Sequence, residues 1–416
     1  MKRENQRPQI SGSNPRPTTC RDTRRDHPYS SLRRPSALDF RKLFLSFGCV
    51  LTLLLMPPPS AAAKPDALLV VVLAQTGIAA EDNRPALEAA YLAVDQINAA
   101  GGLLGRPLKM NVIDNQSTPL GAKAAAQKAV KLKATAVVGA VWSSHCLAMA
   151  PILQRAGIPM VTPTASNPAV TLIGDYIFRA CFIDSFQGKV MAQFAREDLS
   201  AKSAGIFINV NENYSQELAH FFQAAFEASG GIVAWKGNYT GTAVDFSELL
   251  KSAASSGVDI FFLPGYARDS GLLLKQGRKM GISTTFLGGD GWGTQIGEYA
   301  GDAIDGCYYS THWHPDADNQ QSRSLLRHFR HRYPHTEVND SRIPLTYDAV
   351  MLVAGAIKRA GSYDCKKVRD ALSGTVGFQG ATGEITFDAN GDPLDKQAAI
   401  VKCVGRQQKF LKLVKP

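Results

Sequence analysis

The fold is decided first in residues 67–102, which read ALLVVVLAQTGIAAEDNRPALEAAYLAVDQINAAGG. Residues Ala67–Ala74 are a short apolar run rich in valine, which predicts a buried strand. After a turn, we expect Asn83 to cap a helix that tolerates Pro85 in its first turn, and Gly101-Gly102 to end that helix. A strand, a turn and a helix in this order form the repeating unit of a parallel α/β sheet.

The same unit recurs along the chain in two series. The first series has expected strands at Leu108–Asp114, Ala136–Ala140 and Ile158–Thr162, and helices at Gly121–Lys133 and Ser144–Ala156. The second has strands at Ser203–Asn209, Gly231–Trp235, Val258–Leu263 and Thr284–Leu287, and helices at Tyr214–Ser229, Phe246–Ser255 and Ser270–Met280. The last third has helices at Ser322–Arg332, Tyr347–Ala360 and Lys366–Leu372, and strands at Gly383–Phe387, Ala398–Val404 and Lys409–Val414. This pattern predicts two α/β lobes, each with a parallel sheet covered on both faces.

The N-terminal segment has the features of an export signal. Residues 1–42 are polar and rich in arginine, Leu43–Met56 is a nearly continuous apolar run of fourteen residues, and Ala61-Ala62-Ala63 supplies small residues. A transmembrane helix needs about 20 apolar residues, so a retained membrane anchor is the weaker alternative. We therefore expect cleavage near Ala63 and a periplasmic protein.

The positive charge of the chain belongs largely to this leader. Residues 1–63 hold eleven of the 46 Lys and Arg residues and four of the 36 Asp and Glu residues, so the remainder carries a net charge of +3 instead of +10. The basic composition is therefore no argument for nucleic-acid binding. An odd number of cysteines follows the leader, so at least one thiol has no partner within the chain; they are Cys146, Cys181, Cys307, Cys365 and Cys403.

Polar and aromatic residues follow the expected strands, where ligands bind in open α/β sheets. The candidate ligand-binding residues are Trp142, Ser143, Ser144, Thr164, Ala165, Ser166, Tyr214, Tyr266, Asp290 and Trp292. Hydroxyl groups and helix N-terminal amides suit a carboxylate, and Asp290 suits an ammonium group, so the set fits a zwitterion. Equally, Ser143, Ser144 and Thr164 are residue types that cap helices or stabilise turns.

Six stretches carry a family resemblance: YLAVDQINAAGGLLG (Tyr91–Gly105), IDN (Ile113–Asn115), VGAVWSS (Val138–Ser144), IPMVTPTASNP (Ile158–Pro168), FRACFIDSFQG (Phe178–Gly188) and FLGGDGW (Phe286–Trp292). In this order they resemble the type I periplasmic solute-binding proteins, and specifically the leucine/isoleucine/valine-binding family of ABC transporters. The resemblance implies two lobes joined by three crossing strands, with the ligand between them. We expect lobe 1 at residues 64–184 and 313–395, and lobe 2 at residues 185–312 and 396–416.

The resemblance also implies roles for the candidate residues. Ser143 or Ser144 and the Thr164–Ser166 region would hold an α-carboxylate, and Tyr214 and Tyr266 would close the cleft from the second lobe. Asp290 stands where the family has an acid for the α-ammonium, often a longer glutamate. Trp142 and Trp292 would reduce the side-chain pocket, stack on a planar group or pack between the lobes.

These features predict a monomeric binding component of an ABC importer that takes an amino acid, with the branched-chain type favoured, and passes it to a membrane permease. No motif indicates a cofactor, and no nucleophile–base pair indicates an enzyme. His312 and His314 are spaced as metal ligands on a strand would be, but we favour a solvated surface for them and for His328, His331 and His335. The alternatives are a ligand-sensing module, an amide- or urea-binding protein of the same fold, and a hydrolase on an α/β scaffold.

Overall fold

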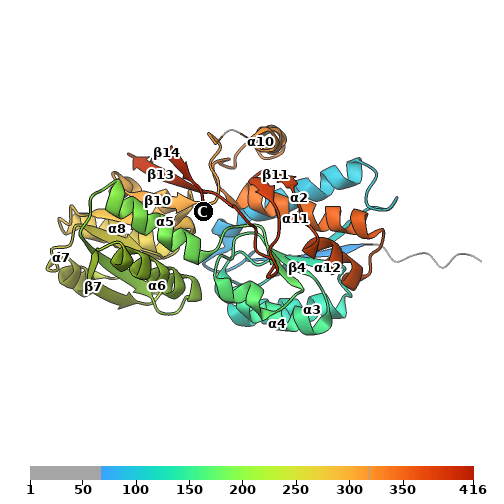
Figure 1. The fold of residues 1–416 in the computed structure, drawn as a ribbon, viewed down its shortest axis with the longest axis horizontal. Coiled ribbons are helices and arrows are strands. Elements are labelled where there is room, and N and C mark those ends of the chain that lie inside the picture. The colour runs from blue at the N-terminus through green and yellow to red at the C-terminus, as the bar shows by residue number, and fades with distance from the viewer. Residues whose placement is uncertain (1–66, 318) are drawn as a thin grey trace, which may run out of the picture. The chain divides into compact units, whose positions relative to one another are not determined.

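The computed structural model describes residues 67–317 and 319–416, and Pro65–Pro416 form one compact unit with two large sheets and one two-stranded sheet (Figure 1). The expected signal segment lies outside the described residues. Among the helices of the described part, none combines the length and the apolar character that crossing a membrane requires.

Lobe 1 contains a five-stranded parallel sheet in the order β2-β1-β3-β4-β5. Its strands are β1 (Leu68–Leu73), β2 (Lys109–Asp114), β3 (Ala136–Gly139), β4 (Met160–Thr162) and β5 (Ile177–Arg179). The helices around it are α2 (Ala80–Ala99), α3 (Pro119–Lys131), α4 (Ser143–Ala156), α10 (Gln320–Arg332), α11 (Arg342–Ala360) and α12 (Cys365–Ser373), with the 3₁₀ helix η1 (Pro168–Ile173) and the small hairpin β11 (Phe378–Gly380) and β12 (Gly383–Ile385).

Strand β1 shows why this sheet is covered on both faces. Successive side chains of a strand point to opposite faces. Leu69 and Val71 pack in one apolar core with residues of α2 and α11, whereas Val70 and Val72 pack in another with residues of α3 and α4. A strand that is apolar at every position is therefore buried on both sides, as the sequence predicted.

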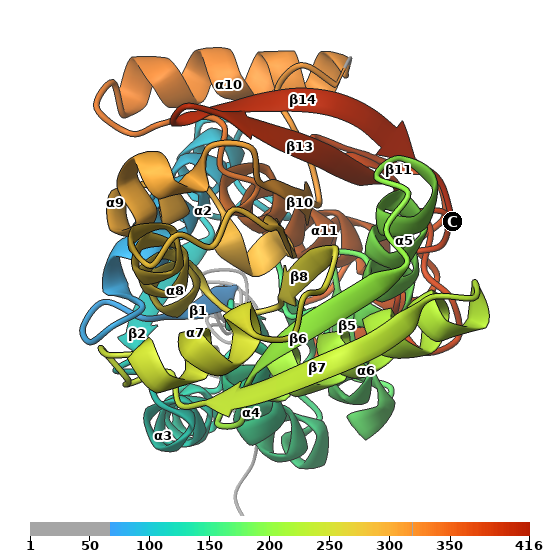
Figure 2. The same ribbon diagram turned by 90° about the vertical axis from the view of Figure 1, so that its left-hand side faces the viewer.

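Lobe 2 contains a seven-stranded sheet in the order β14-β13-β10-β9-β8-β6-β7. Its strands are β6 (Ser203–Asn209), β7 (Ile232–Tyr239), β8 (Ile260–Leu263), β9 (Thr285–Gly288), β10 (Tyr308–Thr311), β13 (Ala398–Val404) and β14 (Gln407–Val414). Its helices are α5 (Asp184–Glu197), α6 (Asn213–Ala228), α7 (Ser247–Ala254), α8 (Ala267–Lys279) and α9 (Ile296–Ala300), with the 3₁₀ helices η2 (Asp290–Trp292) and η3 (Gly301–Ile304). Figure 2 shows α7 and α8 on one side of strands β6–β8 and α5 and α6 on the other.

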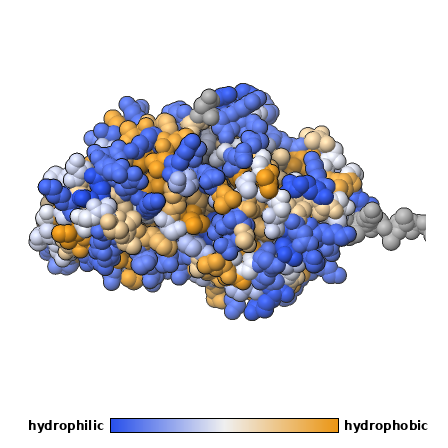
Figure 3. Space-filling model, in the orientation of Figure 1, coloured by the Kyte–Doolittle hydropathy of each residue, from blue (hydrophilic) through white to orange (hydrophobic). Residues whose placement is uncertain are grey.

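The two lobes share a strand order that the sequence does not repeat. Strands β7-β6-β8-β9-β10 of lobe 2 follow the same parallel order as β2-β1-β3-β4-β5 of lobe 1. Lobe 2 adds the hairpin of β13 and β14, which pairs antiparallel with β10. Its edge strand β14 exposes Leu411 and Leu413, and Figure 3 shows hydrophobic side chains over this edge, on a face that mixes hydrophilic and hydrophobic areas.

The expected elements are largely confirmed, and strands β6 and β13 match their predictions to the residue. The capping role of Asn83 is wrong: α2 begins at Ala80, and the Asn83 Oδ1 accepts a hydrogen bond from the Ala74 amide at 3.1 Å instead. Strands β5 and β10 and helix α5 were not predicted from the sequence. These elements lie where the chain passes between the two sheets, after β5, after β10 and again before β13.

Candidate functional site

The start of α4 brings three predicted residues to the carboxyl end of β3. Trp142 precedes the helix and makes no side-chain cap. The Ser143 Oγ accepts a hydrogen bond from the Asn167 amide at 3.3 Å, so it ties the β3–α4 turn to the loop after β4. The Ser144 Oγ donates to the Glu212 Oε2 of lobe 2 at 2.9 Å. Neither serine therefore caps its own helix, and the first amides of α4 remain available for an anion.

The loop after β4 is held in place by a buried arginine. Arg179 on β5 is fully buried and donates to the carbonyl oxygens of Ala165 at 2.7 Å and Asn167 at 3.0 Å. The Thr164 Oγ1 donates to the Val141 carbonyl at 2.9 Å. The buried Ser166 hydroxyl faces the buried carboxyl group of Asp184, and Ser166 does not line the small cavity between the lobes.

In lobe 2, Asp290 is already engaged by two neighbours. The Tyr214 hydroxyl donates to Asp290 Oδ1 at 3.0 Å and accepts from the Gly291 amide at 3.1 Å. His312 Nε2 lies 3.0 Å from Asp290 Oδ2. Burial raises the pKa of Asp290, but His312, together with hydrogen bonds to the carboxylate, outweighs burial, so this pKa lies below its ordinary value. Asp290 is therefore an ionised acid in a buried position.

Residues of both lobes line one small cavity of about 20 Å³; they are Val141, Trp142, Ser143, Thr164, Tyr214, Tyr266, Asp290, Gly291, Ser341 and Arg342. Its size results from an aromatic stack, because Trp142 of lobe 1 lies on Tyr266 of lobe 2 with ring centroids 4.1 Å apart and planes at 7°. Tyr214 in turn stacks on Tyr266, with ring centroids 5.2 Å apart. A volume near 20 Å³ holds about one water molecule, so a solute can occupy this site only when the stack separates.

Arg342, the cation that lines this cavity, was not among the residues predicted from the sequence. Arg342 begins α11, five residues before the predicted start at Tyr347. Its guanidinium pairs with Asp340 at 2.9 Å and lies 3.7 Å from Asp82, and Gln295 of lobe 2 donates to Asp340 at 2.9 Å. Burial opposes the charge, but Asp340 and Asp82 raise the pKa of Arg342. Pro344, a residue typical of a first helical turn, was the available signal for the earlier helix start.

Trp292 does not reach the cavity. It is fully buried in the core of lobe 2, and its Nε1 donates to the Leu263 carbonyl at 3.0 Å. Gly288 makes this position possible, because a Cβ there would lie 2.2 Å from the indole ring. Its role as a ligand-binding residue is therefore not supported, and its apolar surroundings explain its presence.

The histidines divide into two groups. His328, His331 and His335 are exposed, as expected. The prediction of a solvent-exposed position was wrong for His312 and His314, whose residues are only 3% and 4% exposed. His312 reaches Asp290, and His314 Nδ1 lies 3.6 Å from Asp316. The five cysteines after the leader are all free thiols.

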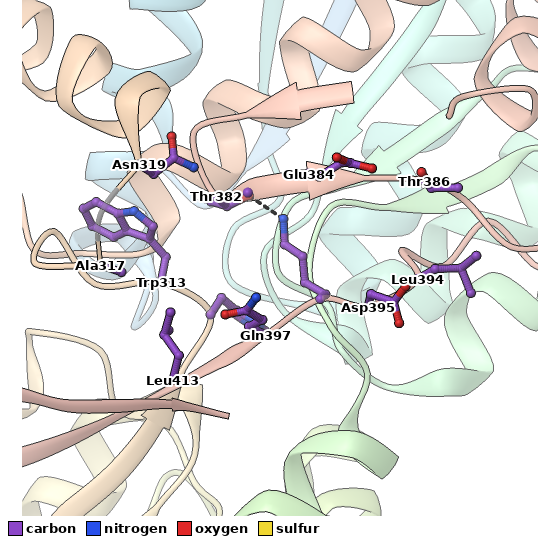
Figure 4. Close-up of a pocket in the computed structure, with 13 residues that line it drawn as sticks. Trp313, Ala317, Asn319, Thr382, Glu384, Thr386, Leu394, Asp395, Gln397 and Leu413 are labelled. Carbon is purple, nitrogen blue, oxygen red and sulfur yellow. Dashed lines mark hydrogen bonds between the residues drawn. The ribbon is translucent and has the colours of Figure 1, made fainter. Parts of the chain in front are cut away.

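A separate cavity of about 430 Å³ lies among the segments that pass between the lobes (Figure 4). Trp313 and Leu413 lie on one side of it in this view. Lys396 is buried and donates from Nζ to the Thr382 Oγ1 at 2.6 Å. Burial lowers the pKa of Lys396 to about 8, although Asp348 partly offsets this effect. None of the predicted ligand-binding residues lines this cavity of about 430 Å³.

Two similarly wound lobes with a polar and aromatic site between them define a solute-binding protein. The chain belongs to the periplasmic binding protein family, whose model matches residues 69–408, and it is a binding protein rather than an enzyme. Over 307 residues it is 31% identical to the leucine-, isoleucine-, valine-, threonine- and alanine-binding protein of Pseudomonas aeruginosa, a match that covers 73% of this chain and 80% of the relative.

Two solved structures are similar in both sequence and fold. The leucine-binding protein LivK of Thermotoga maritima is 33% identical with a TM-score of 0.80, over 84% of this chain and 99% of that one. The branched-chain amino acid transporter substrate-binding protein LivJ of Streptococcus pneumoniae, solved in complex with isoleucine, is 28% identical with a TM-score of 0.80, over 85% of this chain and 100% of that one. These similarities confirm the type I periplasmic-binding-protein fold that the sequence predicted.

Proposed function

We propose that this protein is the extracytoplasmic solute-binding component of an ABC importer and that it binds an amino acid as its two lobes close. The observation that carries the proposal is the position of the cavity, at the carboxyl ends of both sheets and between the lobes. Ser143 and Thr164 come from lobe 1, whereas Tyr214, Tyr266 and Asp290 come from lobe 2. Only closure brings these groups around one ligand.

The charges of the site suit the two ends of an α-amino acid. The first amides of α4, with Ser143 and the Thr164–Ser166 loop, would hold the α-carboxylate. Asp290 would hold the α-ammonium, because it is an ionised acid in a buried site. The Tyr266 hydroxyl lines the cavity and is buried without a hydrogen-bond partner, which supports its use by a ligand.

Separation of the Trp142–Tyr266 stack would open the site. The two rings belong to different lobes, so a rotation at the crossing segments moves them apart and exposes the hydroxyl groups of lobe 1. One relative named above is a leucine-, isoleucine-, valine-, threonine- and alanine-binding protein and another was solved with isoleucine, which supports an amino acid as the ligand. The remaining expectations belong to the same proposal: export with cleavage near Ala63, a periplasmic monomer, delivery to a permease, and lobe boundaries near residues 184, 312 and 395.

Titration calorimetry of the purified, leader-free protein against the twenty amino acids tests the proposal. We expect at least one to bind with a Kd of about 10 μM or lower, near −7 kcal/mol. Ser143→Ala should weaken that binding, whereas Ser255→Ala, at an exposed position after α7, should leave it unchanged. Failure of every amino acid to bind at millimolar concentration would refute the proposal.

A further inference from the structure

A second small cavity, of about 30 Å³, lies on the other side of the Trp142–Tyr266 pair. Both rings line it as well as the first cavity. Three acids from separate elements face it: Asp82 of α2, Glu212 before α6 and Asp269 of α8. We call Asp82, Glu212, Asp269, Trp142 and Tyr266 the acidic subsite. Its remaining lining residues are Ile78, Asn209, Gly241 and Arg268.

Positive charge in the acidic subsite is too scarce for its three carboxyl groups. Asp269 accepts from the Tyr239 hydroxyl at 2.6 Å and the Asn209 amide at 3.2 Å, and Glu212 accepts from Ser144, so their hydrogen-bond donors are neutral. In the described part of the chain, no ion pair within 4 Å involves Glu212 or Asp269. Arg268 is the one basic residue among those that line the cavity; it is half-buried, donates to the Gly241 carbonyl at 2.9 Å and keeps its positive charge, so one cation stands against three carboxyl groups.

Asp82 shares the guanidinium of Arg342 with a second acid, Asp340. Arg342 lies 3.7 Å from Asp82 but 2.9 Å from Asp340, so most of its charge is already matched. Burial raises the pKa of Asp82 to about 6 although the charge of Arg342 opposes it, and burial raises the pKa of Asp269 to about 6 and that of Glu212 to about 7. At neutral pH a closed cleft therefore holds acids that a positive charge would stabilise.

The aromatic rings beside these acids favour the same occupant. Trp142 and Tyr266 stack face to face with ring centroids 4.1 Å apart, so a ring face becomes open to a cation only when this stack separates. A cation over such a face is attracted by the ring, by about 2 kcal/mol or more where water is excluded. The Tyr266 hydroxyl is buried and has no hydrogen-bond partner, so an ammonium group can donate to it. Apolar side chains are scarce, since Ile78 is the single aliphatic residue among those that line this cavity. A branched-chain side chain would find carboxyl groups here instead of an apolar pocket.

We propose that the acidic subsite binds the cationic end of the ligand's side chain, so the ligand class is amino acids with a positively charged side chain, such as lysine, ornithine or arginine. The proposal rests on the proposed function, which places the α-ammonium and α-carboxylate in the first cavity. Trp142 and Tyr266 separate the two cavities. When the lobes part, the methylene chain of a ligand can pass between the rings and link both cavities. A ligand without the charge leaves Glu212 and Asp269 unmatched in the closed form.

Calorimetry with lysine and norleucine tests the subsite, because norleucine has the same straight carbon chain without the terminal amine. We expect lysine to bind at least about 100-fold more tightly, as two charge-assisted hydrogen bonds would give. Glu212→Gln and Asp269→Asn should each reduce this preference about tenfold. The matched control is Glu248→Gln, since Glu248 is 86% exposed in its ion pair with Lys251 and should leave the preference unchanged.

The outcomes separate the two proposals. Tight binding of leucine or norleucine with no preference for lysine overturns the acidic subsite and leaves the proposed function standing. Failure of every amino acid to bind overturns both. A lysine preference that survives in Glu212→Gln and Asp269→Asn, with both variants folded by circular dichroism, overturns the assignment of these residues.

Discussion

Asp290→Asn tests whether the buried acid of lobe 2 recognises the ligand's ammonium group. The substitution keeps the shape of the side chain and removes its charge. In the structure the carboxylate accepts from Tyr214 at 3.0 Å and meets His312 at 3.0 Å, and the side chain is 10% exposed. An ammonium group that enters the cavity therefore meets an acid that is already oriented and ionised.

The expected loss follows from the kind of contact removed. A hydrogen bond to a charged group contributes about 1.5–3 kcal/mol. Since about 1.4 kcal/mol corresponds to a tenfold change in Kd, affinity for an α-amino acid should fall by about 10- to 150-fold. The low pKa of Asp290 also means that its ionised form stabilises the fold above the ordinary carboxyl pKa and that this contribution is lost as the pH falls through the lowered value. The variant should accordingly lose less stability on acidification than the wild type.

Calorimetry at pH 7 measures the affinity, and urea unfolding from pH 7 to pH 3 measures the stability. Asp316→Asn is the matched control, because Asp316 also faces a histidine, at 3.6 Å, but is 73% exposed. It should change neither quantity appreciably. An Asp290→Asn protein that binds its amino acid as tightly as the wild type would refute the assignment of the ammonium site.

Two further substitutions test the framework around the site. Arg179→Met leaves Asp392 without the guanidinium that lies 2.5 Å away, and it also removes the donors to two loop carbonyls. Urea unfolding should show a loss of about 3–5 kcal/mol, and a loss below about 1 kcal/mol would contradict this role. Lys396 has a lowered pKa of about 8 against an ordinary 10.5, so the unfolded state binds the extra proton between these values and stability rises with pH there. The wild type should gain up to about 3 kcal/mol relative to Lys396→Met from pH 8 to 10.5, and parallel stability curves would show that the amine is not desolvated.

Local pattern accounts for most of the fold that could be predicted. Strand β1 is apolar at every position, which predicts burial on both faces of the sheet. In the structure Leu69 packs in one hydrophobic core and Val70 in another. Six of the site residues could be expected at one cavity because parallel strands bring their carboxyl ends to one edge; they are Trp142, Ser143, Thr164, Tyr214, Tyr266 and Asp290.

Contacts between distant segments account for what the sequence missed. Arg342 lies more than 50 residues beyond Asp290 and reaches the cleft through the packing of α11 in lobe 1. Trp292 stands two residues from Asp290, yet the space above Gly288 directs it into the core of lobe 2. No local sequence pattern predicts the position of either side chain, because each position depends on a surface that other elements form.

The sequence by itself determined the two-lobed α/β class, the strand ends that carry the site, and the acid and hydroxyl groups found there, because hydrophobic period and residue chemistry are local properties. Tertiary structure alone decided the Trp142–Tyr266 stack, the pairing of Asp290 with His312, and the grouping of Asp82, Glu212 and Asp269 around one cavity. These are contacts across lobes or between remote strands, and their burial sets the charge balance from which the cationic ligand class is inferred.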